Sequence, residues 1–189
     1  MTNLVHRIFE AEHLKQIKHE WWRLAGVQFP DSVGEHALVA AQIGRYLAVL
    51  EWVDPYRVVT TLVFHDLPKT RIGDLHRVAT RYITGKDKAE EQICTEQMTD
   101  MPWGEEIRAL FLAFETRADQ VGSIAKDADY LEQAFQAKIY LEQGYTAAQD
   151  RITNVGKVLR SWSSVQLWEQ LQTVGSTNWR QGLKKIPTQ

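Results

Sequence analysis

The stretch SVGEHALVAAQIGRYLAVL, residues 32–50, decides the fold class that the sequence predicts. Apolar residues recur in it at intervals of three and four, which is the spacing of one face of an α-helix. One histidine shares this face, so the helix is expected to turn an imidazole toward the core. The positions on the face are His36, Ala40, Ile43, Leu47 and Leu50.

A second helix is predicted to begin at Asp54-Pro55, because aspartate is a favoured cap and proline suits the first helical turn. Pro68 stops or kinks this helix just after the dipeptide His65-Asp66, since proline lacks the amide hydrogen that a helix interior needs. Two consecutive helices therefore each carry a histidine on an inward face. The inward positions of the second helix are Val58, Leu62 and His65.

Helical periodicity continues through the rest of the chain, without an alternating strand pattern, an internal repeat or a low-complexity linker. We predict an all-α fold: a compact single-domain helical bundle over residues 1–175, followed by a loosely held C-terminal tail at residues 176–189. Further helices are predicted at residues 74–82, 86–98, 103–114, 123–142, 146–160 and 163–174. The helix over 123–142 is expected to bury Ile124, Ala128, Leu131, Phe135 and Ile139.

Composition narrows the classes of function. The chain has 189 residues, a formal net charge of −2 and a pI near 6.3, so it offers no basic stripe for a nucleic-acid backbone or an anionic membrane. No apolar run approaches the roughly 18 residues of a membrane span, and no apolar signal segment begins the chain. The single cysteine, Cys94, cannot form an internal disulfide. We expect a soluble, cytoplasmic protein with neither a polymeric nucleic acid nor a membrane as its partner.

Chemically matched residues stand out at His36, at the pair His65-Asp66 and at Asp129. Two imidazoles and two carboxylates form a mixed nitrogen and oxygen set that suits a hard or borderline divalent cation. Burying an imidazole beside a carboxylate is costly unless a partner such as a cation compensates. Simpler roles stay open here, because a lone buried histidine is usually just hydrogen-bonded. Asp127 and Asp129 could both be solvated charges, and periodicity only weakly prefers Asp129 as the inward one.

Three strings resemble the ordered H, HD and D motifs of the HD-domain metal-dependent phosphohydrolases: DSVGEH at 31–36, HDLPKTRIGDL at 65–75 and KDADYLE at 126–132. The resemblance is strongest to the branch that includes the 5'-deoxynucleotidases, and it runs from about residue 14 to residue 144. It implies a helical bundle of the HD-domain type. It also implies one divalent metal ion, with Co, Mn, Mg, Fe, Ni and Zn not distinguished. The implied ligands are His36, His65, Asp66 and Asp129.

The resemblance further implies hydrolysis of a phosphate, in which the metal binds a phosphate oxygen and activates a water. Asp66 would orient the nucleophile, and Asp74 is a candidate for proton transfer, with a helix N-cap as its alternative role. A glutamate usually serves as the acid in this branch, but this chain has Lys69 in its place. Lys69 is therefore a candidate for catalysis and for contact with an extra phosphate, unless it simply faces solvent.

Candidates for substrate binding precede the first metal ligand. By resemblance they are Lys18, His19 and Trp22, where Trp22 matches a tryptophan that packs near the sugar or base and His19 stands where an arginine is common. Trp21 and Trp22 could equally be core or dimer-interface residues. The sequence thus predicts a metal-dependent phosphohydrolase acting on a small-molecule nucleotide, either a monophosphate or, because of Lys69, a di- or triphosphate.

Two other classes of protein remain open. A noncatalytic nucleotide-binding HD protein would keep the pocket and lack the acid. A di-iron HD-fold oxygenase would need further ligands, for which His76 or Glu35 would have to serve. A homo-oligomer is compatible with the family resemblance and with the chain's seven tryptophans.

Overall fold

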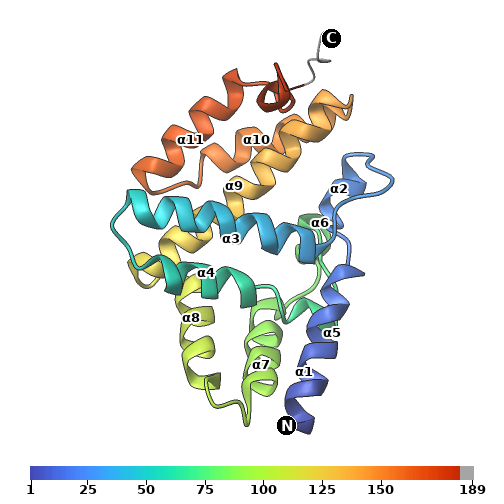
Figure 1. Cartoon of the computed structure of the whole chain (residues 1–189). Helices are drawn as coiled ribbons and strands as arrows, with labels where there is room; N and C mark the ends of the chain where they lie inside the picture. Colours follow the sequence, from blue (N-terminus) through green and yellow to red (C-terminus); the bar gives the residue numbers. More distant parts are fainter. Residues whose placement is uncertain (184–189) are drawn as a thin grey trace, which may run out of the picture.

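A computed structural model describes residues 1–183, and over these residues the chain is all-helical, as predicted (Figure 1). The longer helices are α1 (Thr2–Glu12), α3 (Val33–Leu50), α4 (Pro55–Phe64), α7 (Lys86–Met98), α8 (Gly104–Thr116), α9 (Gln120–Glu142), α10 (Gln149–Gly156) and α11 (Trp162–Thr173). Single-turn helices lie between them at α2 (Trp21–Leu24), α5 (Lys69–Ile72) and α6 (Arg77–Thr80). Short 3-10 segments lie at His13–Lys15, Thr146–Ala148 and Asn178–Arg180.

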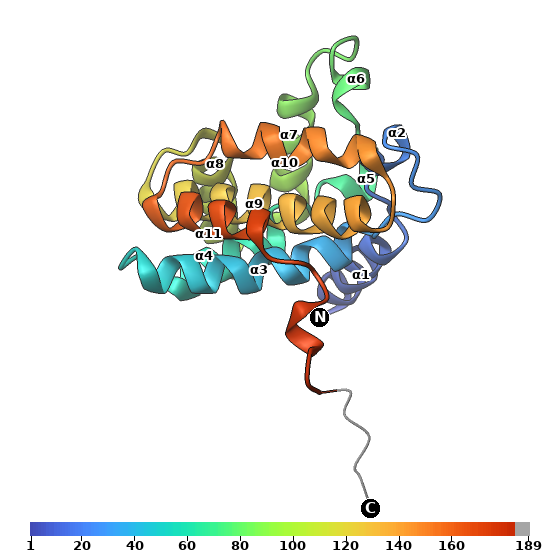
Figure 2. The same cartoon turned by 90° about the horizontal axis from the view of Figure 1, so that it is seen from above.

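Helix α9 is the centre of the bundle. It contacts α3, α4, α8, α10 and α11, and Figure 2 shows α3 and α4 on one side of it and α10 on the other. Alanines supply much of its buried surface, since Ala125, Ala128, Ala134 and Ala137 are all 0% exposed. Small side chains let the axes of neighbouring helices approach closely. The polar residues that α9 carries are therefore brought near the backbones of its neighbours.

The crossing of α3 with α4 and α9 depends on Gly44. A Cβ atom at this position would lie 2.2 Å from Leu62 Cδ1, 3.0 Å from Val58 Cγ1 and 3.5 Å from Ala128 Cβ. Leu62 and Val58 are fully buried, so neither side chain can move aside into solvent. Glycine at position 44 thus sets how closely the three helices meet.

Local hydrogen bonds fix where α3 and α4 begin. Ser32 Oγ accepts from the Glu35 amide at 3.2 Å, and Glu35 Oε2 accepts from the Ser32 amide at 2.6 Å, which together form a capping box. Asp54 Oδ1 accepts from two amides of the first turn of α4, at 2.9 and 3.3 Å, so the predicted cap is confirmed. Helix α4 ends at Phe64, so His65 and Asp66 follow immediately after its last turn.

The prediction of one helix over residues 74–82 is wrong. Only α6 is helical there, because Gly73 adopts a left-handed φ of 74° and His76 is extended with ψ 154°. The N-cap of α6 is His76, whose Nδ1 accepts from the Ala79 amide at 3.1 Å. Asp74 is therefore not a helix cap, because its carboxylate is engaged by partners elsewhere.

Other helix predictions need smaller corrections. Leu50 is 57% exposed although Leu47 is fully buried, because the buried face of α3 ends one turn before the helix does. Ile139, near the end of α9, is likewise 37% exposed. The helix predicted over 146–160 is a 3-10 turn followed by α10, which ends at Gly156. Helix α1 has no buried residue, so it has no buried stripe of the kind that periodicity detects.

The predicted tail is only partly described. Ser176, at its start, is tied to the end of α9, because its amide and hydroxyl donate to Glu142 Oε2 at 3.0 and 2.5 Å. Residues 184–189 of the tail lie outside the described residues. Within residues 1–183, none of the helices combines the length and the apolar character that a membrane span requires.

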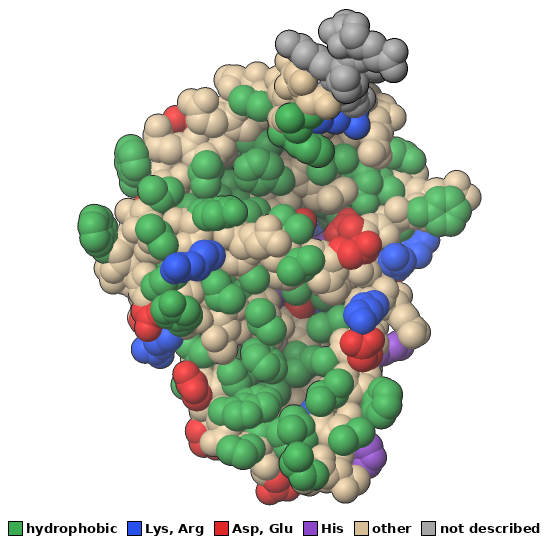
Figure 3. Space-filling view, viewed as in Figure 1, with side chains coloured by type: hydrophobic (Ala, Val, Ile, Leu, Met, Phe, Trp, Pro, Cys, Tyr) green, Lys and Arg blue, Asp and Glu red, His purple; other side chains and the backbone are tan. Residues whose placement is uncertain are grey.

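Exposed apolar side chains gather on the face of the molecule formed by α1, α3 and α4 (Figure 3). The expectation of a homo-oligomer stays a prediction. This face is an apolar surface on which a second copy of the chain could pack. Its members include Ile8, Phe9, Leu38, Tyr46, Val49, Tyr56 and Val63.

Gly44→Ala should destabilise the protein although alanine is the better helix former. The added methyl group overpacks the crossing by about 1–3 kcal/mol, which outweighs a gain in helix propensity of up to about 1 kcal/mol. The matched control is Gly34→Ala in the same helix, where a Cβ atom would meet nothing nearer than 3.4 Å. Urea unfolding should show a lower midpoint for Gly44→Ala than for Gly34→Ala, and equal midpoints would contradict this account of the crossing.

Candidate metal centre

The residues predicted to hold a metal come from three helices that meet in the bundle. His36 lies near the start of α3, His65 and Asp66 follow the last turn of α4, and Asp129 lies in the middle of α9. Since α3 contacts both α4 and α9, the structure brings the four side chains together. His36 Nε2 lies 3.2 Å from Asp129 Oδ1 and 3.9 Å from Asp66 Oδ2, and His65 Nε2 lies 3.4 Å from Asp66 Oδ2.

Each of the two imidazoles is held at Nδ1. His36 Nδ1 donates to the Glu132 carboxylate, one turn beyond Asp129 on α9, and His65 Nδ1 donates to the Leu62 carbonyl at 2.8 Å. The Nε2 atoms of both rings are buried and have no hydrogen-bond partner. With the proton on Nδ1, Nε2 carries a free lone pair, which is the usual state of an imidazole that ligates a metal.

These distances fit a shared coordination sphere. Donors bonded at about 2.1 Å lie about 3.0 Å apart when adjacent and about 4.2 Å apart when opposite. The ligand atoms of His36, His65 and Asp129 all lie within 4.8 Å of one another, and Asp66 reaches the same two imidazoles. Small side-chain movements would therefore place all four donors on one ion, and two orphaned imidazole nitrogens are what such an ion would satisfy.

The carboxylates of the centre stay ionised. Burial by itself raises the pKa of Asp129, but the His36 imidazole at 3.2 Å and the charge of Lys126 hold it well below its ordinary value. Burial also raises the pKa of Asp66, and the charges of His65 and Lys69 lower it below its ordinary range. The centre thus offers negative oxygen donors at neutral pH.

Lys69 is an internal cation at the edge of the centre. Its Nζ lies 2.9 Å from Asp66 Oδ2 and 2.9 Å from Asp74 Oδ1, and its side chain is only 14% exposed. The alternative of a solvent-facing lysine is therefore wrong. Burial lowers the pKa of Lys69, but the two carboxylates outweigh burial and raise the pKa above its ordinary value. Asp74 is fixed in turn, because its Oδ2 accepts from the Glu20 amide at 2.9 Å.

A cavity of about 150 Å³ opens beside the four residues. Gln133 joins it to the metal centre, since Gln133 Nε2 donates to Asp129 Oδ1 at 2.6 Å. Trp22 contributes to the wall but is 1% exposed and packs on Tyr140, with ring centroids 5.1 Å apart. Trp22 is therefore mainly a core residue. The lining residues are His19, Trp21, Trp22, Lys69, Asp74, Leu75, His76, Arg77, Lys86, Gln133 and Arg151.

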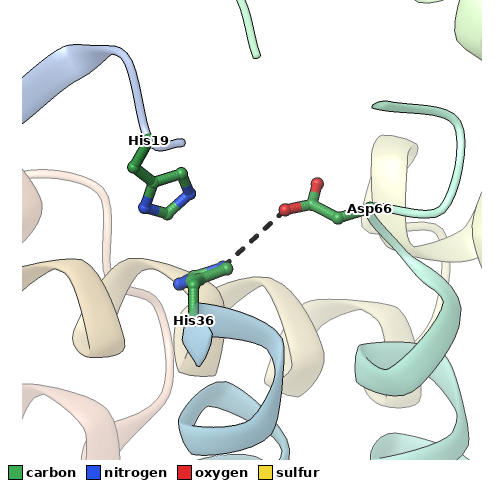
Figure 4. Close-up of side chains that lie close together, drawn as sticks. All are labelled: His19, His36 and Asp66. Carbon is green, nitrogen blue, oxygen red and sulfur yellow. Dashed lines mark ion pairs between the residues drawn. The ribbon is translucent and has the colours of Figure 1, made fainter. Parts of the chain in front are cut away.

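Other residues singled out in the sequence lie elsewhere or are already engaged. Lys18 lines a different groove, between α1, α3 and α4, and does not line the cavity. Glu35 is held in the capping box of α3, and His76 caps α6. Neither of these two residues belongs to a group of metal-binding side chains among the residues that the structure describes. His19 does belong to such a group, with His36 and Asp66 (Figure 4).

Asp127 and Asp129 have separate roles. Asp127 is fully buried and is not a solvated charge, because Arg117 Nη1 lies 2.8 Å from its Oδ1. Its Oδ2 accepts from the Ser161 amide and the Ser164 hydroxyl, both at 2.8 Å. Asp127 therefore fastens the start of α11 to α9, while Asp129 faces the imidazoles.

Sequence reasoning missed three residues that matter here. Glu132 is three positions after Asp129 and so shares its helical face, a spacing that could have identified it. Gln133, four positions after Asp129, lies on the same helical face and could have been found in the same way. Arg151 gave no local signal, because helix packing brings α10 to the cavity.

Most of the chain matches a known family of proteins. Residues 11–168 match the model of the HD domain. A 5'-deoxynucleotidase from Dictyostelium discoideum is 28% identical over 154 residues, which cover 76% of this chain and 80% of that protein.

Solved structures agree in fold. A protein from Pyrococcus horikoshii OT3 has a TM-score of 0.76 and 25% identity, covering 90% of this chain and 98% of that one. A protein described as a predicted metal-dependent phosphohydrolase, from Magnetospirillum magnetotacticum MS-1, has a TM-score of 0.66 and 18% identity, covering 91% and 90%. At 18% identity the likeness concerns the fold alone.

Substitution of the two neighbouring aspartates should separate stability from metal binding. Asp127→Asn leaves buried Arg117 without its charge partner and should lower the free energy of unfolding by about 3–5 kcal/mol. Asp129→Asn should keep the fold and weaken Mn²⁺ binding. Chemical denaturation and calorimetric titration of Mn²⁺ measure the two effects. A folded Asp129→Asn protein with unchanged Mn²⁺ affinity would count against Asp129 as a ligand.

Proposed function

Since the chain belongs to the HD-domain family, we propose that it is a divalent-metal-dependent phosphohydrolase acting on nucleotides that carry more than one phosphate. The metal-binding arrangement of His36, His65, Asp66 and Asp129 supports a metal-dependent reaction. Similarity to a 5'-deoxynucleotidase supports a nucleotide as substrate. The proposed preference for several phosphates rests on the positive charge of the adjoining cavity.

The cavity is lined by four cationic side chains, Lys69, Arg77, Lys86 and Arg151, and by one carboxylate, Asp74. Lys69 and Lys86 have acidic partners, whereas Arg77 and Arg151 form no ion pair within residues 1–183. Arginine presents a planar fork of donors that matches the oxygens of phosphate. The free cationic charge therefore supports a ligand more negative than a single phosphate ester.

Arg151 is the clearest of these cations. Its Nε is buried and has no hydrogen-bond partner, and burial lowers the pKa of its guanidinium. An unpaired charge in such a place is costly. A phosphate oxygen would remove that cost, since it would supply both an opposite charge and a hydrogen-bond acceptor. The guanidinium also lies over the Trp21 ring, 5.6 Å from its centroid, so an indole and the proposed phosphate anchor lie together in the wall of the cavity.

Lys69 favours cleavage of a bond between phosphates over cleavage of a sugar ester. A sugar alkoxide is a strong base and needs a proton as it leaves, whereas a phosphate leaving group is a much weaker base. The raised pKa of Lys69 makes it a poor proton donor and a permanent positive charge. It can therefore stabilise a leaving phosphate without protonating it.

A single divalent ion held by His36, His65, Asp66 and Asp129 would supply Lewis acidity and lower the pKa of a bound water. The chain's own residues provide the rest. Asp66 lies where it can orient the attacking water as well as ligate. Asp74 positions the ammonium group of Lys69, and Gln133 positions the Asp129 carboxylate.

The alternative of a noncatalytic nucleotide-binding protein also rests on Lys69, because this lysine replaces the usual acid. A protein that bound nucleotide and released no phosphate with any metal would be such a binder. The oxygenase alternative receives no support, because Glu35 and His76 are engaged in helix caps.

A panel of nucleoside mono-, di- and triphosphates tests the proposal, with Mg²⁺, Mn²⁺ or Co²⁺ added and with phosphate and pyrophosphate release measured. Di- or triphosphates should be the better substrates. Arg151→Ala should raise KM for them by about 10- to 150-fold, as expected for a lost charged hydrogen bond of about 1.5–3 kcal/mol. The control is Arg108→Ala, a surface residue paired with Glu105. A strong preference for monophosphates would overturn the polyphosphate part of the proposal.

Lys69→Glu should shift the substrate preference toward monophosphates. The carboxylic acid would restore a proton donor for an alkoxide leaving group and remove the charge that stabilises a leaving phosphate. The ratio of kcat/KM for monophosphate to that for triphosphate should rise at least tenfold. If the ratio is unchanged, Lys69 does not select the leaving group.

A further inference from the structure

His19 lies within reach of the metal centre although it belongs to none of the helices that form it. It precedes α2, and its side chain is buried at 6% exposure. The ring centroids of His19 and His36 are 4.6 Å apart. The ligand atoms of His19, His36 and Asp66 all lie within 4.8 Å of one another, and Figure 4 shows the three side chains around a common space.

A carboxylate holds the far side of the His19 ring. His19 Nδ1 lies 3.2 Å from Asp31 Oδ2. Asp31 is itself fixed, because Tyr140 Oη donates to its Oδ1 at 3.1 Å and accepts from its amide at 3.0 Å. The backbone adds to this, since the His19 amide donates to the Asp31 carbonyl at 3.0 Å.

The three histidines of this region share one feature. An acceptor faces Nδ1 of each ring: the Asp31 carboxylate for His19, the Glu132 carboxylate for His36 and the Leu62 carbonyl for His65. For His36 and His65 this contact is a hydrogen bond, which sets the tautomer that leaves Nε2 as the ligand atom, and for His19 it is a charge contact at 3.2 Å that turns the other side of the ring toward His36.

The His19 group and the His65 group describe one site. Both groups contain His36. Since His36 Nδ1 is taken by Glu132, His36 has only Nε2 to offer, and one nitrogen lone pair binds one ion. An ion bound at His36 Nε2 would therefore lie within reach of His19 as well as of His65 and Asp129.

We propose that His19 is a fifth protein ligand of this metal ion, so that three imidazoles and two carboxylates surround it. Three imidazoles shift the preference of the site from Mg²⁺ toward Co²⁺, Ni²⁺, Zn²⁺ and Fe²⁺, since imidazole suits these metals and Mg²⁺ takes oxygen ligands.

Metal titration of the full chain without nucleotide tests the assignment. His19→Ala should weaken Co²⁺ and Zn²⁺ binding by about tenfold or more, and Mg²⁺ binding much less. His13→Ala removes an exposed histidine and should leave every metal affinity unchanged. His36→Ala, as a positive control, should weaken binding by all these metals.

X-ray absorption of the Zn²⁺-loaded wild-type protein gives a readout that needs no variant, because imidazole rings have a distinct scattering signature. Three imidazoles per zinc are expected in the wild type and two in His19→Ala. Two imidazoles in the wild type, or unchanged Zn²⁺ affinity in folded His19→Ala, would overturn the assignment. A rise in nucleotide KM alone in His19→Ala would give His19 a phosphate-binding role instead. These measurements do not depend on hydrolysis, so the proposed reaction can fail while the ligand assignment stands.

Discussion

Burial of ionisable groups where α3, α4 and α9 meet is the constraint on which the structure depends. Two imidazoles and two carboxylates lie within a few ångströms of one another in a helical core, where unpaired charge is costly. The helices can bring these groups so close only because the crossing is lined by small residues such as Gly44 and Ala128. The packing that holds the fold together thus also sets the spacing of the metal centre.

Contacts at Nδ1 orient the histidines of the metal centre. An acceptor faces Nδ1 of each histidine, and helices α4 and α9 hold these acceptors in place. Glu132 belongs to α9, the Leu62 carbonyl belongs to the last turn of α4, and Asp31 is held by Tyr140 from α9. The hydrogen bonds from α4 and α9 therefore fix the tautomers and ring directions of His36 and His65.

The cavity beside the metal centre contains the residue at which this chain departs from the motif of the resembling nucleotidases. Lys69 stands where the resembling nucleotidases have an acid, and its ammonium group bridges Asp66 and Asp74. Arg77 and Arg151 add cationic charge that no carboxylate in residues 1–183 pairs. Lys69 and the two unpaired arginines both support the proposed preference for nucleotides with several phosphates, since a leaving phosphate needs charge stabilisation more than it needs a proton.

The sequence by itself determined the helical class and the start of α4, because periodicity and caps are properties of neighbouring residues. It also singled out His36, His65-Asp66 and Asp129 in order along the chain, while leaving open which of two aspartates on α9 faced inward. Only the tertiary structure decided that Asp127 fastens α11, that Lys69 turns inward and that Lys18 lies in another groove. The role of Arg151 also depends on packing. These outcomes depend on how helices cross, and a crossing brings together residues that are far apart in the sequence and share no local pattern.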